Sequence, residues 1–292
     1  MRVALIHDYL NQYGGGERVL EVLMEMFPEA PIYTLLYDPE KTFGKFMNRE
    51  VKTSILDFPE ARKNHRPFIP LMPVAMKTLS INGDYDLIIS DTAGFAKGIG
   101  IKSNIKHISY IHTPLRYAWE QETYLNGLIS HFLFLISKPI LNWLRDWDYK
   151  AGQKPDVLLA NSQFIAGKIK NYYNRNASVI YPPVDTKKFF YDPKSHTPNP
   201  KSYYLAIGRL LHYKRFDLVI DAFAKLGLPL KIVGSGPEEQ RIKSQVSSFK
   251  NIELVPFINN EQELRKLYNG AKALIFPQVE DFGLVAAEAM AC

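Results

Sequence analysis

Short apolar runs alternate with helical patterns along most of this 292-residue chain. The clearest runs near the N-terminus are Val3–Ile6, Leu87–Ser90 and His107–Ile111, and each ends in polar or turn residues. Continuous rather than alternating hydrophobicity is typical of parallel strands that are covered on both faces. Between the first two runs, apolar residues recur at helical spacing over Glu17–Phe27. This alternation predicts an α/β fold with a parallel sheet.

The same alternation restarts after a polar segment with three prolines, residues 192–202, which is typical of a linker. Before it, Val157–Ala160 and Ser178–Tyr181 are predicted as strands. After it, the predicted elements are the strands Tyr203–Ile207, Leu230–Val233, Ile252–Val255 and Ala273–Phe276 and the helices Phe216–Leu226, Glu238–Phe249, Glu261–Asn269 and Leu284–Ala291. The length allows each half to bury its own core. We therefore expect two domains, residues 1–195 and 196–292.

An aromatic, apolar stretch covers residues 125–147 and is interrupted at Lys138 and Pro139. The uninterrupted part is too short to span a bilayer. Two interpretations stay open. The stretch is either a packed pair of helices in the first domain or an amphipathic surface that contacts a membrane or a lipid-linked acceptor.

Composition excludes several other classes of protein. With Cys292 as its one cysteine, the chain can form no internal disulfide, and its first residues read as a buried strand rather than a signal peptide. We expect a cytoplasmic protein. The net charge of +6 lies in the second half and includes no basic run of the kind that marks a nucleic-acid tail. This excess fits a nucleotide diphosphate site or ordinary solvated surface charge equally well.

Three glycines, Gly14, Gly15 and Gly16, follow the first predicted strand and open a helix. Glycine lets the backbone approach a ligand closely, and a helix N-terminus offers unpaired N–H groups to an anion. Because the glycines do not form the G-x-G-x-x-G fingerprint, NAD binding is not indicated. The loop is either a ligand contact or a turn.

Polar residues also follow the strands of the first half. His112 comes directly after a predicted strand, His7 and Asp8 end the first strand, and Arg116 follows closely. The carboxyl ends of parallel strands form the ligand-binding edge of open α/β sheets. His112 is therefore either a ligand contact, to a sugar hydroxyl or a leaving group, or a structural histidine.

The second half carries a basic cluster, Gly208–Arg215, directly between a strand and a helix. Arg209 and Lys214 can converge on one diphosphate there. Breaking a glycosyl–phosphate bond builds negative charge on the leaving group, which a metal or fixed cations and amides must offset. Neither acidic D-x-D triplet, at 84–86 or 146–148, follows a strand, and the histidines lack ligand spacing. We therefore predict no metal site.

Two further segments point to a donor-binding role. Gly234 and Gly236 form a loop after a strand, which suits contact with a base, ribose or phosphate, or a tight turn. Glu280 is predicted in a loop and Glu288 about one and a half turns into the following helix. A carboxylate on an apolar helix needs a partner, and a ribose diol would serve for Glu288.

The string EDFGLVAAEAMAC at 280–292 closely resembles the E-x7-E region of the family 4 retaining glycosyltransferases of the GT-B fold. Other short motifs follow one another along the chain in the same order as in that family: GGGE, IHTP, Asn161-Ser162, YPPVD, IGRL with YKR, and VGSGP. The resemblance covers essentially the whole chain and implies two Rossmann-like domains whose parallel sheets face a central cleft. Because family members continue past residue 292, the second domain is expected to be incomplete and the chain truncated.

The resemblance also implies residue roles. Arg209 and Lys214 would hold the donor diphosphate, Glu280 the transferred sugar and Glu288 the ribose. His112 would lie beside the donor sugar. The remaining donor contacts that it implies are Gly15, Gly16, Gly208, Gly234, Gly236, Phe282, Gly283 and Leu284. The family retains anomeric configuration and needs no metal or other cofactor.

Residues 111–125 look like the bacterial branch that includes O-antigen and capsule mannosyltransferases. GDP-mannose is the favoured donor and a glycan or polyprenyl-linked acceptor is expected, while peripheral contact with the inner face of the plasma membrane stays open. Two other functions stay open: a non-hydrolysing sugar-nucleotide epimerase, and a nucleotide-sugar-binding protein without transferase activity.

Overall fold

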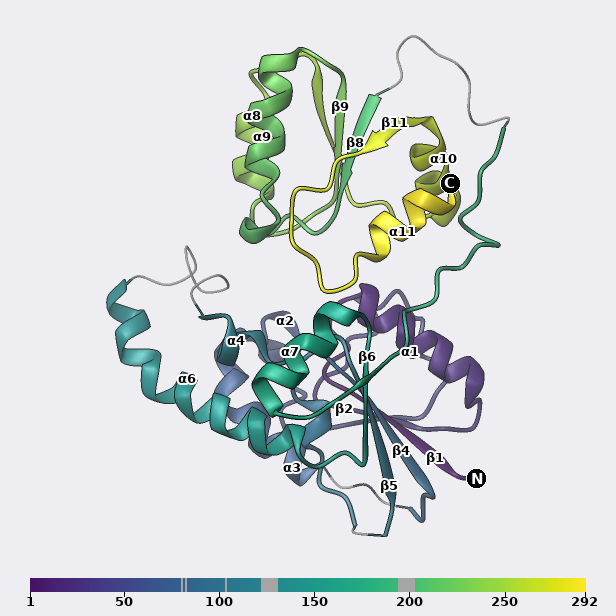
Figure 1. Cartoon of the computed structure of the whole chain (residues 1–292), viewed down its shortest axis with the longest axis vertical. Helices are drawn as coiled ribbons and strands as arrows, with labels where there is room; N and C mark the ends of the chain where they lie inside the picture. Colours follow the sequence, from purple (N-terminus) through teal and green to yellow (C-terminus); the bar gives the residue numbers. More distant parts are fainter. Residues whose placement is uncertain (80, 82, 103, 122–130, 194–202) are drawn as a thin grey trace. The chain divides into compact units, whose positions relative to one another are not determined.

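The computed structural model describes residues 1–79, 81, 83–102, 104–121, 131–193 and 203–292. The chain divides into two compact domains, Met1–Pro182 and Pro183–Cys292 (Figure 1). The boundary therefore falls before the predicted one at residue 195. Phe189 explains the difference, because its buried ring packs into the core of the second domain with Leu205 and Tyr268.

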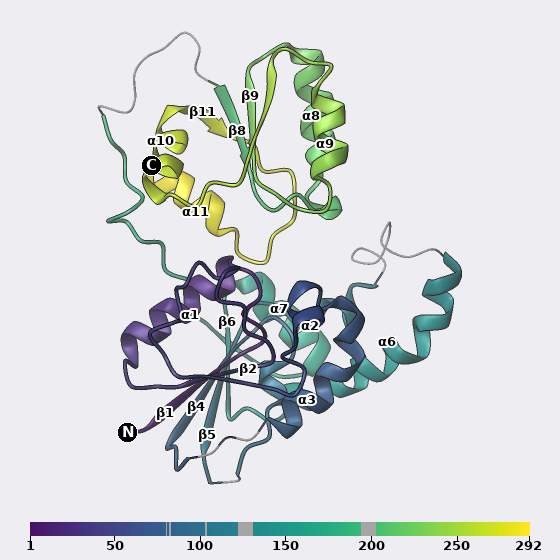
Figure 2. The same cartoon turned by 180° about the vertical axis from the view of Figure 1, so that it is seen from behind.

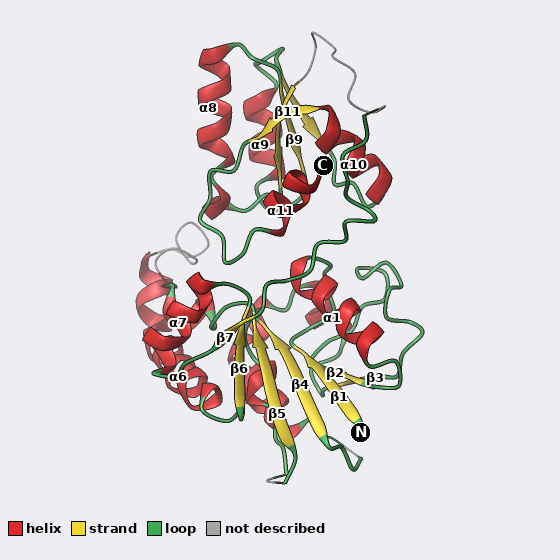
Figure 3. Cartoon of the chain, turned by 45° about the vertical axis from the view of Figure 1, so that its right-hand side comes forward, coloured by secondary structure: helices red, strands yellow, loops and turns green. Residues whose placement is uncertain are grey.

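The first domain is built on a seven-stranded parallel sheet with the order β3-β2-β1-β4-β5-β6-β7. Its strands are β1 (Val3–His7), β2 (Ile32–Thr34), β3 (Val51–Thr53), β4 (Leu87–Thr92), β5 (Lys106–Ile111), β6 (Val157–Ala160) and β7 (Ser178–Val179). The carboxyl ends of β1, β4 and β5, the three adjacent central strands, therefore meet at one edge of the sheet (Figure 3).

Both faces of this sheet are covered, which explains the continuous apolar runs. Along β1, Ala4 and Ile6 enter one core cluster, whereas Val3 and Leu5 enter another. Successive side chains of a strand point to opposite faces, so each face must be buried. The helix α1 (Gly15–Met26) covers one face, and α3 (Met72–Thr78) and α6 (His131–Gly152) cover the other.

The other helices among the described residues of the first domain are α2 (Pro59–Lys63), η1 (Arg66–Leu71), η2 (Ala96–Gly98), α4 (Arg116–Trp119) and α7 (Gln163–Tyr173). Figure 2 labels α2 and α7. Ser162 caps α7, because its hydroxyl accepts a hydrogen bond from the backbone N–H of Ile165 at 3.1 Å.

The described part of the aromatic stretch, residues 131–147, lies in α6, which runs on through Pro139. Lys138 and Pro139 therefore interrupt the apolar run without ending the helix, while residues 125–130 lie outside the described residues. Proline removes one helical hydrogen bond, and the buried packing of Leu141 and Leu144 on the core offsets this loss. Among the residues that the structure describes, no helix is both long and apolar enough to cross a bilayer.

The second domain has a four-stranded parallel sheet with the order β10-β9-β8-β11. Its strands are β8 (Tyr203–Ile207), β9 (Leu230–Val233), β10 (Ile252–Val255) and β11 (Ala271–Leu274), and its helices are η3 (His212–Lys214), α8 (Phe216–Leu226), α9 (Glu239–Val246), α10 (Glu261–Gly270) and α11 (Leu284–Ala291). All eight elements predicted from the sequence are present. β11 begins two residues before its predicted start, with a register irregularity between Ala271 and Ala273.

Candidate active site

The central polar cluster of the first domain lies at the carboxyl ends of β1, β4 and β5. Asp91, in β4, is the register partner of His7 in β1. Its Oδ2 lies 2.8 Å from Nδ1 of His7, and its Oδ1 lies 2.6 Å from Nε2 of His112, the residue after β5. One buried carboxylate thus holds two imidazole rings. His112 is one of the site residues predicted from the sequence, whereas Asp91 is not.

The electrostatics of this cluster favour its charged forms. Burial lowers the pKa of His7, but Asp91 and Glu17 outweigh it, and the pKa is raised. Burial likewise lowers the pKa of His112, and the opposing Asp91 carboxylate again raises it overall. For Asp91, burial raises the pKa, but the two histidines bring it below its ordinary value. A nearby opposite charge stabilises the charged form of each group.

The glycine loop of α1 lies against this cluster. A side chain at Gly16 would place its Cβ 3.5 Å from Nε2 of His112 and 3.6 Å from Cε1 of His7. Gly14 is the N-cap residue and Gly15 the first residue of α1. Glu17, also buried, has its Oε1 3.7 Å from Nε2 of His7. The predicted positions Gly15 and Gly16 therefore lie at the same sheet edge as His112.

Asn161, the residue after β6, fixes the backbone beside His112. Its side-chain amide donates to the carbonyl of His112 at 3.1 Å, and its own N–H donates to Ile111. In the sequence, Asn161 stands out only as part of the family pattern, because an asparagine after a strand has no specific signal of its own.

Two acidic residues near this edge are structural. Asp8 accepts hydrogen bonds from the backbone N–H groups of Ala93, Phe95 and Ala96, at 2.6 to 2.7 Å, and thereby caps the turn after β4. Asp148 is fully buried and lies 2.6 Å from Nζ of Lys97. No group of acidic, histidine or cysteine residues suited to a metal is found among the described residues.

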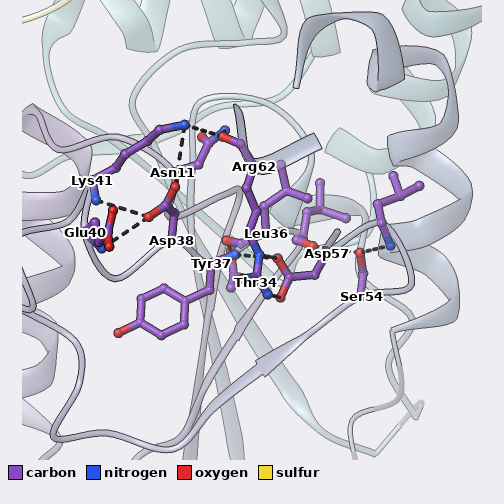
Figure 4. A network of polar contacts seen from close by, with 12 residues as sticks. Asn11, Thr34, Leu36, Tyr37, Asp38, Glu40, Lys41, Ser54, Asp57 and Arg62 are labelled. Atoms are coloured by element: carbon purple, nitrogen blue, oxygen red, sulfur yellow. Dashed lines mark hydrogen bonds and ion pairs between the residues drawn. The ribbon is translucent and has the colours of Figure 1, made fainter. Parts of the chain in front are cut away.

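The loops that follow β1 and β2 are braced by a separate polar network (Figure 4). Arg62 binds Asp57 through two nitrogens at 2.7 and 2.8 Å, and Asp57 accepts the N–H of Tyr37 at 3.0 Å. The carbonyl of Arg62 accepts from both Lys41 and Asn11. This network holds the chain between the first strand and the glycine loop in place.

The second domain brings together two predicted site residues. Nζ of Lys214 in η3 lies 2.7 Å from Oε1 of Glu280, with the two side chains 13% and 20% exposed. Gln278 donates to the same carboxylate at 3.3 Å. Arg209 lies with its side chain exposed in the loop between β8 and η3. The predicted diphosphate-binding lysine and the predicted sugar-binding glutamate are therefore one ion pair.

The glycines after β8 and β9 pack backbone against backbone. A side chain at Gly234 would fall well inside van der Waals contact of the Gly208 carbonyl oxygen, and one at Gly236 would lie 2.5 Å from the Leu210 carbonyl oxygen. A side chain at Gly208 would lie 3.4 Å from Nζ of Lys214. Gly234 and Gly236 thus have a structural reason to be glycine, and Gly208 lies beside the ion pair.

The last helix begins where the E-x7-E pattern predicted. Gly283 is its N-cap residue in the left-handed conformation, with a φ of 87°, and follows Phe282; Leu284 is its first residue. Glu288 is buried, and its carboxylate accepts the hydroxyl of Tyr268 at 3.0 Å. A protein partner thus occupies the position for which a ribose diol had been considered. The role of Glu288 toward ribose stays a prediction.

Solved structures share this architecture. A crystal structure of HepE from Anabaena in complex with UDP is 17% identical with a TM-score of 0.66, and the similarity covers 100% of this chain and 79% of that one. The structure of WaaG, a glycosyltransferase involved in lipopolysaccharide biosynthesis, is 13% identical with a TM-score of 0.65 and covers 99% and 78%. The fold is therefore the GT-B fold of glycosyltransferases.

Sequence comparison defines the family. Residues 13–188 match the family described as Glycosyltransferase Family 4, and residues 187–292 match the one described as Glycosyl transferases group 1. The chain belongs to Glycosyltransferase Family 4. It is 25% identical over 358 residues to the alpha-1,3/1,6-mannosyltransferase ALG2 of Candida glabrata, which covers 99% of this chain and 74% of that protein. An uncharacterised glycosyltransferase of Haemophilus influenzae is 33% identical over 93 residues, 30% of this chain and 26% of that protein.

Proposed function

We propose that this glycosyltransferase moves a hexose, and mannose in particular, from a nucleoside diphosphate sugar to a glycan or lipid-linked acceptor, with retention of configuration and without a metal ion. The similarity to a mannosyltransferase supports the choice of sugar, and GDP-mannose is the favoured donor. The transfer reaction would take place on the cytoplasmic side of the membrane that carries the acceptor.

The observation that carries this proposal is the contact between Lys214 and Glu280. A cation and a carboxylate at this distance can bind the diphosphate and the sugar of one nucleoside diphosphate sugar. Lys214, with Arg209 from the same loop, binds the diphosphate, while Glu280 accepts hydrogen bonds from the sugar hydroxyls. The N–H groups at Gly283 and Leu284 add donors for an anion at the start of α11.

In the proposed reaction the bond between the anomeric carbon and the phosphate oxygen breaks, and the acceptor hydroxyl attacks the same face of the sugar. The hydroxyl proton passes to the leaving phosphate, so atoms and charges balance. The diphosphate gains negative charge as the bond breaks. Lys214 and Arg209 are held in fixed positions and stabilise that charge. Electrostatic stabilisation of this kind is often the largest single contribution to an enzyme's rate enhancement. From the first domain, His112, Gly15 and Gly16 are proposed to contact the donor.

A donor screen tests the proposal. Thermal unfolding is followed with GDP-mannose, GDP, UDP-glucose and UDP, each with EDTA and with magnesium. A ligand at 100 times its Kd stabilises the folded state by about 2.7 kcal/mol, so GDP-mannose should raise the midpoint most, equally with EDTA. A larger response to UDP derivatives would overturn the choice of nucleotide, and a response that requires magnesium would overturn metal independence.

The product of a reaction with donor and an acceptor mixture separates transfer from the other functions. A new α-linked product from an α-linked donor supports a retaining transferase. Conversion of the donor to an epimer without acceptor would instead indicate an epimerase, and binding without turnover would indicate a binding protein.

A further inference from the structure

Both oxygens of Asp91 are occupied by histidine rings from neighbouring strands. The carboxylate is fully buried, and its two contacts, at 2.8 Å to His7 and 2.6 Å to His112, use different oxygens. Because Nε2 of His112 is engaged in this way, its Nδ1 is the ring nitrogen left for a ligand. Turning the ring over would break a charge-assisted hydrogen bond at a buried site, where such bonds are strongest.

The strands dictate this arrangement. β4 lies between β1 and β5, and Asp91 is one residue before its end. The backbone N–H of His112 also donates to Thr92 at 2.8 Å, and the ring of Tyr110 lies edge-on to the His112 ring at 5.2 Å. The imidazole is therefore fixed by its backbone, by a neighbouring ring and by the carboxylate. Glu17 of α1 adds a second negative charge beside His7.

We propose that Asp91 is a positioning residue, which holds the rings of His7 and His112 and leaves Nδ1 of His112 to meet the donor sugar. The contact between His112 and the donor sugar rests on the proposed function, whereas the hold of Asp91 on the two rings does not. When the His112 ring is protonated, its Nδ1–H is a donor that suits a hydroxyl of the donor sugar. Asp91 itself does not touch the donor.

The first test is a titration of the histidine rings by NMR, using ¹⁵N-labelled imidazole in the whole chain. In the wild type, we expect His112 to titrate above the ordinary value of 6.5 with its proton retained on Nε2. Asp91→Asn should lower the midpoint by at least one pH unit, because an opposite charge at this distance shifts a pKa by about one to three units. The matched control is Asp86→Asn, which removes a carboxylate just before the start of the same strand, β4, where its Oδ2 accepts the backbone N–H of Arg2 at 2.7 Å.

The second test measures the affinities for GDP and GDP-mannose by calorimetry. We expect Asp91→Asn to reduce the preference for GDP-mannose over GDP about tenfold and to leave the affinity for GDP within twofold. Asp86→Asn should change neither. His112→Gln should reduce the same preference, which keeps the test valid if the Asp91 variant does not fold.

The outcomes separate the two claims. If His112 of the wild type titrates at or below 6.5, or if Asp91→Asn leaves its midpoint unchanged, Asp91 does not hold the ring and the inference is overturned. A shifted midpoint with an unchanged sugar preference overturns the link to the donor. If the wild type binds neither nucleotide, the proposed function fails, and the titration still decides whether Asp91 positions the histidines.

Discussion

Replacing Lys97 by methionine should destabilise the first domain severely, because it leaves the buried carboxylate of Asp148 without an opposite charge. Lys97 and Asp148 are both 0% exposed, and Nζ lies 2.6 Å from the carboxylate. Asp148 also accepts hydrogen bonds from Trp119 at 2.8 Å, Tyr173 at 2.7 Å and the backbone N–H of Leu115 at 3.4 Å. These three neutral donors cannot offset a full negative charge. Removing one partner of a buried ion pair costs about 3–5 kcal/mol.

A double variant tests whether the buried charge of Asp148 causes the loss of stability. In Lys97→Met with Asp148→Asn, the amide oxygen still accepts from Trp119 and Tyr173, and no charge is left buried. We expect the double variant to lie about 2 kcal/mol or more above the single Lys97→Met variant in its free energy of unfolding.

The assay is denaturant unfolding at pH 7.5, followed by tryptophan fluorescence, since Trp119 contacts Asp148 directly. Lys150→Met on the exposed surface of α6 is the control and should change stability by less than about 0.5 kcal/mol. The reasoning is refuted if Lys97→Met costs less than about 1 kcal/mol, or if the double variant is as unstable as the single one.

Three further predictions concern packing and pH. Gly234→Ala should destabilise the second domain by about 2 kcal/mol or more, because its methyl group collides with the Gly208 carbonyl oxygen; a thermal midpoint equal to the wild type would contradict this. Gly167→Ala, in α7 with open space around it, should stabilise the first domain by about 0.5–1 kcal/mol, and a loss of stability would contradict it. Burial lowers the pKa of His107 to about 4, so the unfolded state binds more protons between pH 4 and 6.5 and stability falls as the pH falls through that window. His107→Gln should therefore lose about 2 kcal/mol less than the wild type between pH 7.5 and 5, whereas equal losses would remove His107 from the account.

The elements predicted from the sequence are mainly apolar strands and helices with a clear apolar period, whereas α3 and α7 are not predicted. Strands such as β1 and β9 are buried on both faces, so their composition alone identifies them. The strands β2 and β3, of three residues each, have too few positions for a pattern and were missed. The boundary before Pro183 was missed because proline-rich composition marks the linker, whereas Phe189 anchors the residues before that linker to the second core.

For the site, the sequence predicts His112 after a strand, Lys214 between a strand and a helix, and Glu280 in a loop, and the structure has them there. Gly283 directly precedes the last helix, as predicted. Which of them touch depends on tertiary packing, and neither the pair of Lys214 with Glu280 nor the bridge at Asp91 follows from spacing. Glu288 shows the converse case, since a buried carboxylate was correctly expected to need a partner, and Tyr268 fills that role.

The central claim is that Lys214 and Arg209 hold the donor diphosphate, and the affinity for GDP tests it most directly. Calorimetry on Lys214→Met and Arg209→Met should show binding at least tenfold weaker than wild type, because each removes a charge-assisted hydrogen bond worth about 1.5–3 kcal/mol. Lys225→Met, a control at the end of α8, should bind GDP within twofold of wild type. If both site variants bind GDP as tightly as the wild type, the diphosphate is held elsewhere and the account is contradicted.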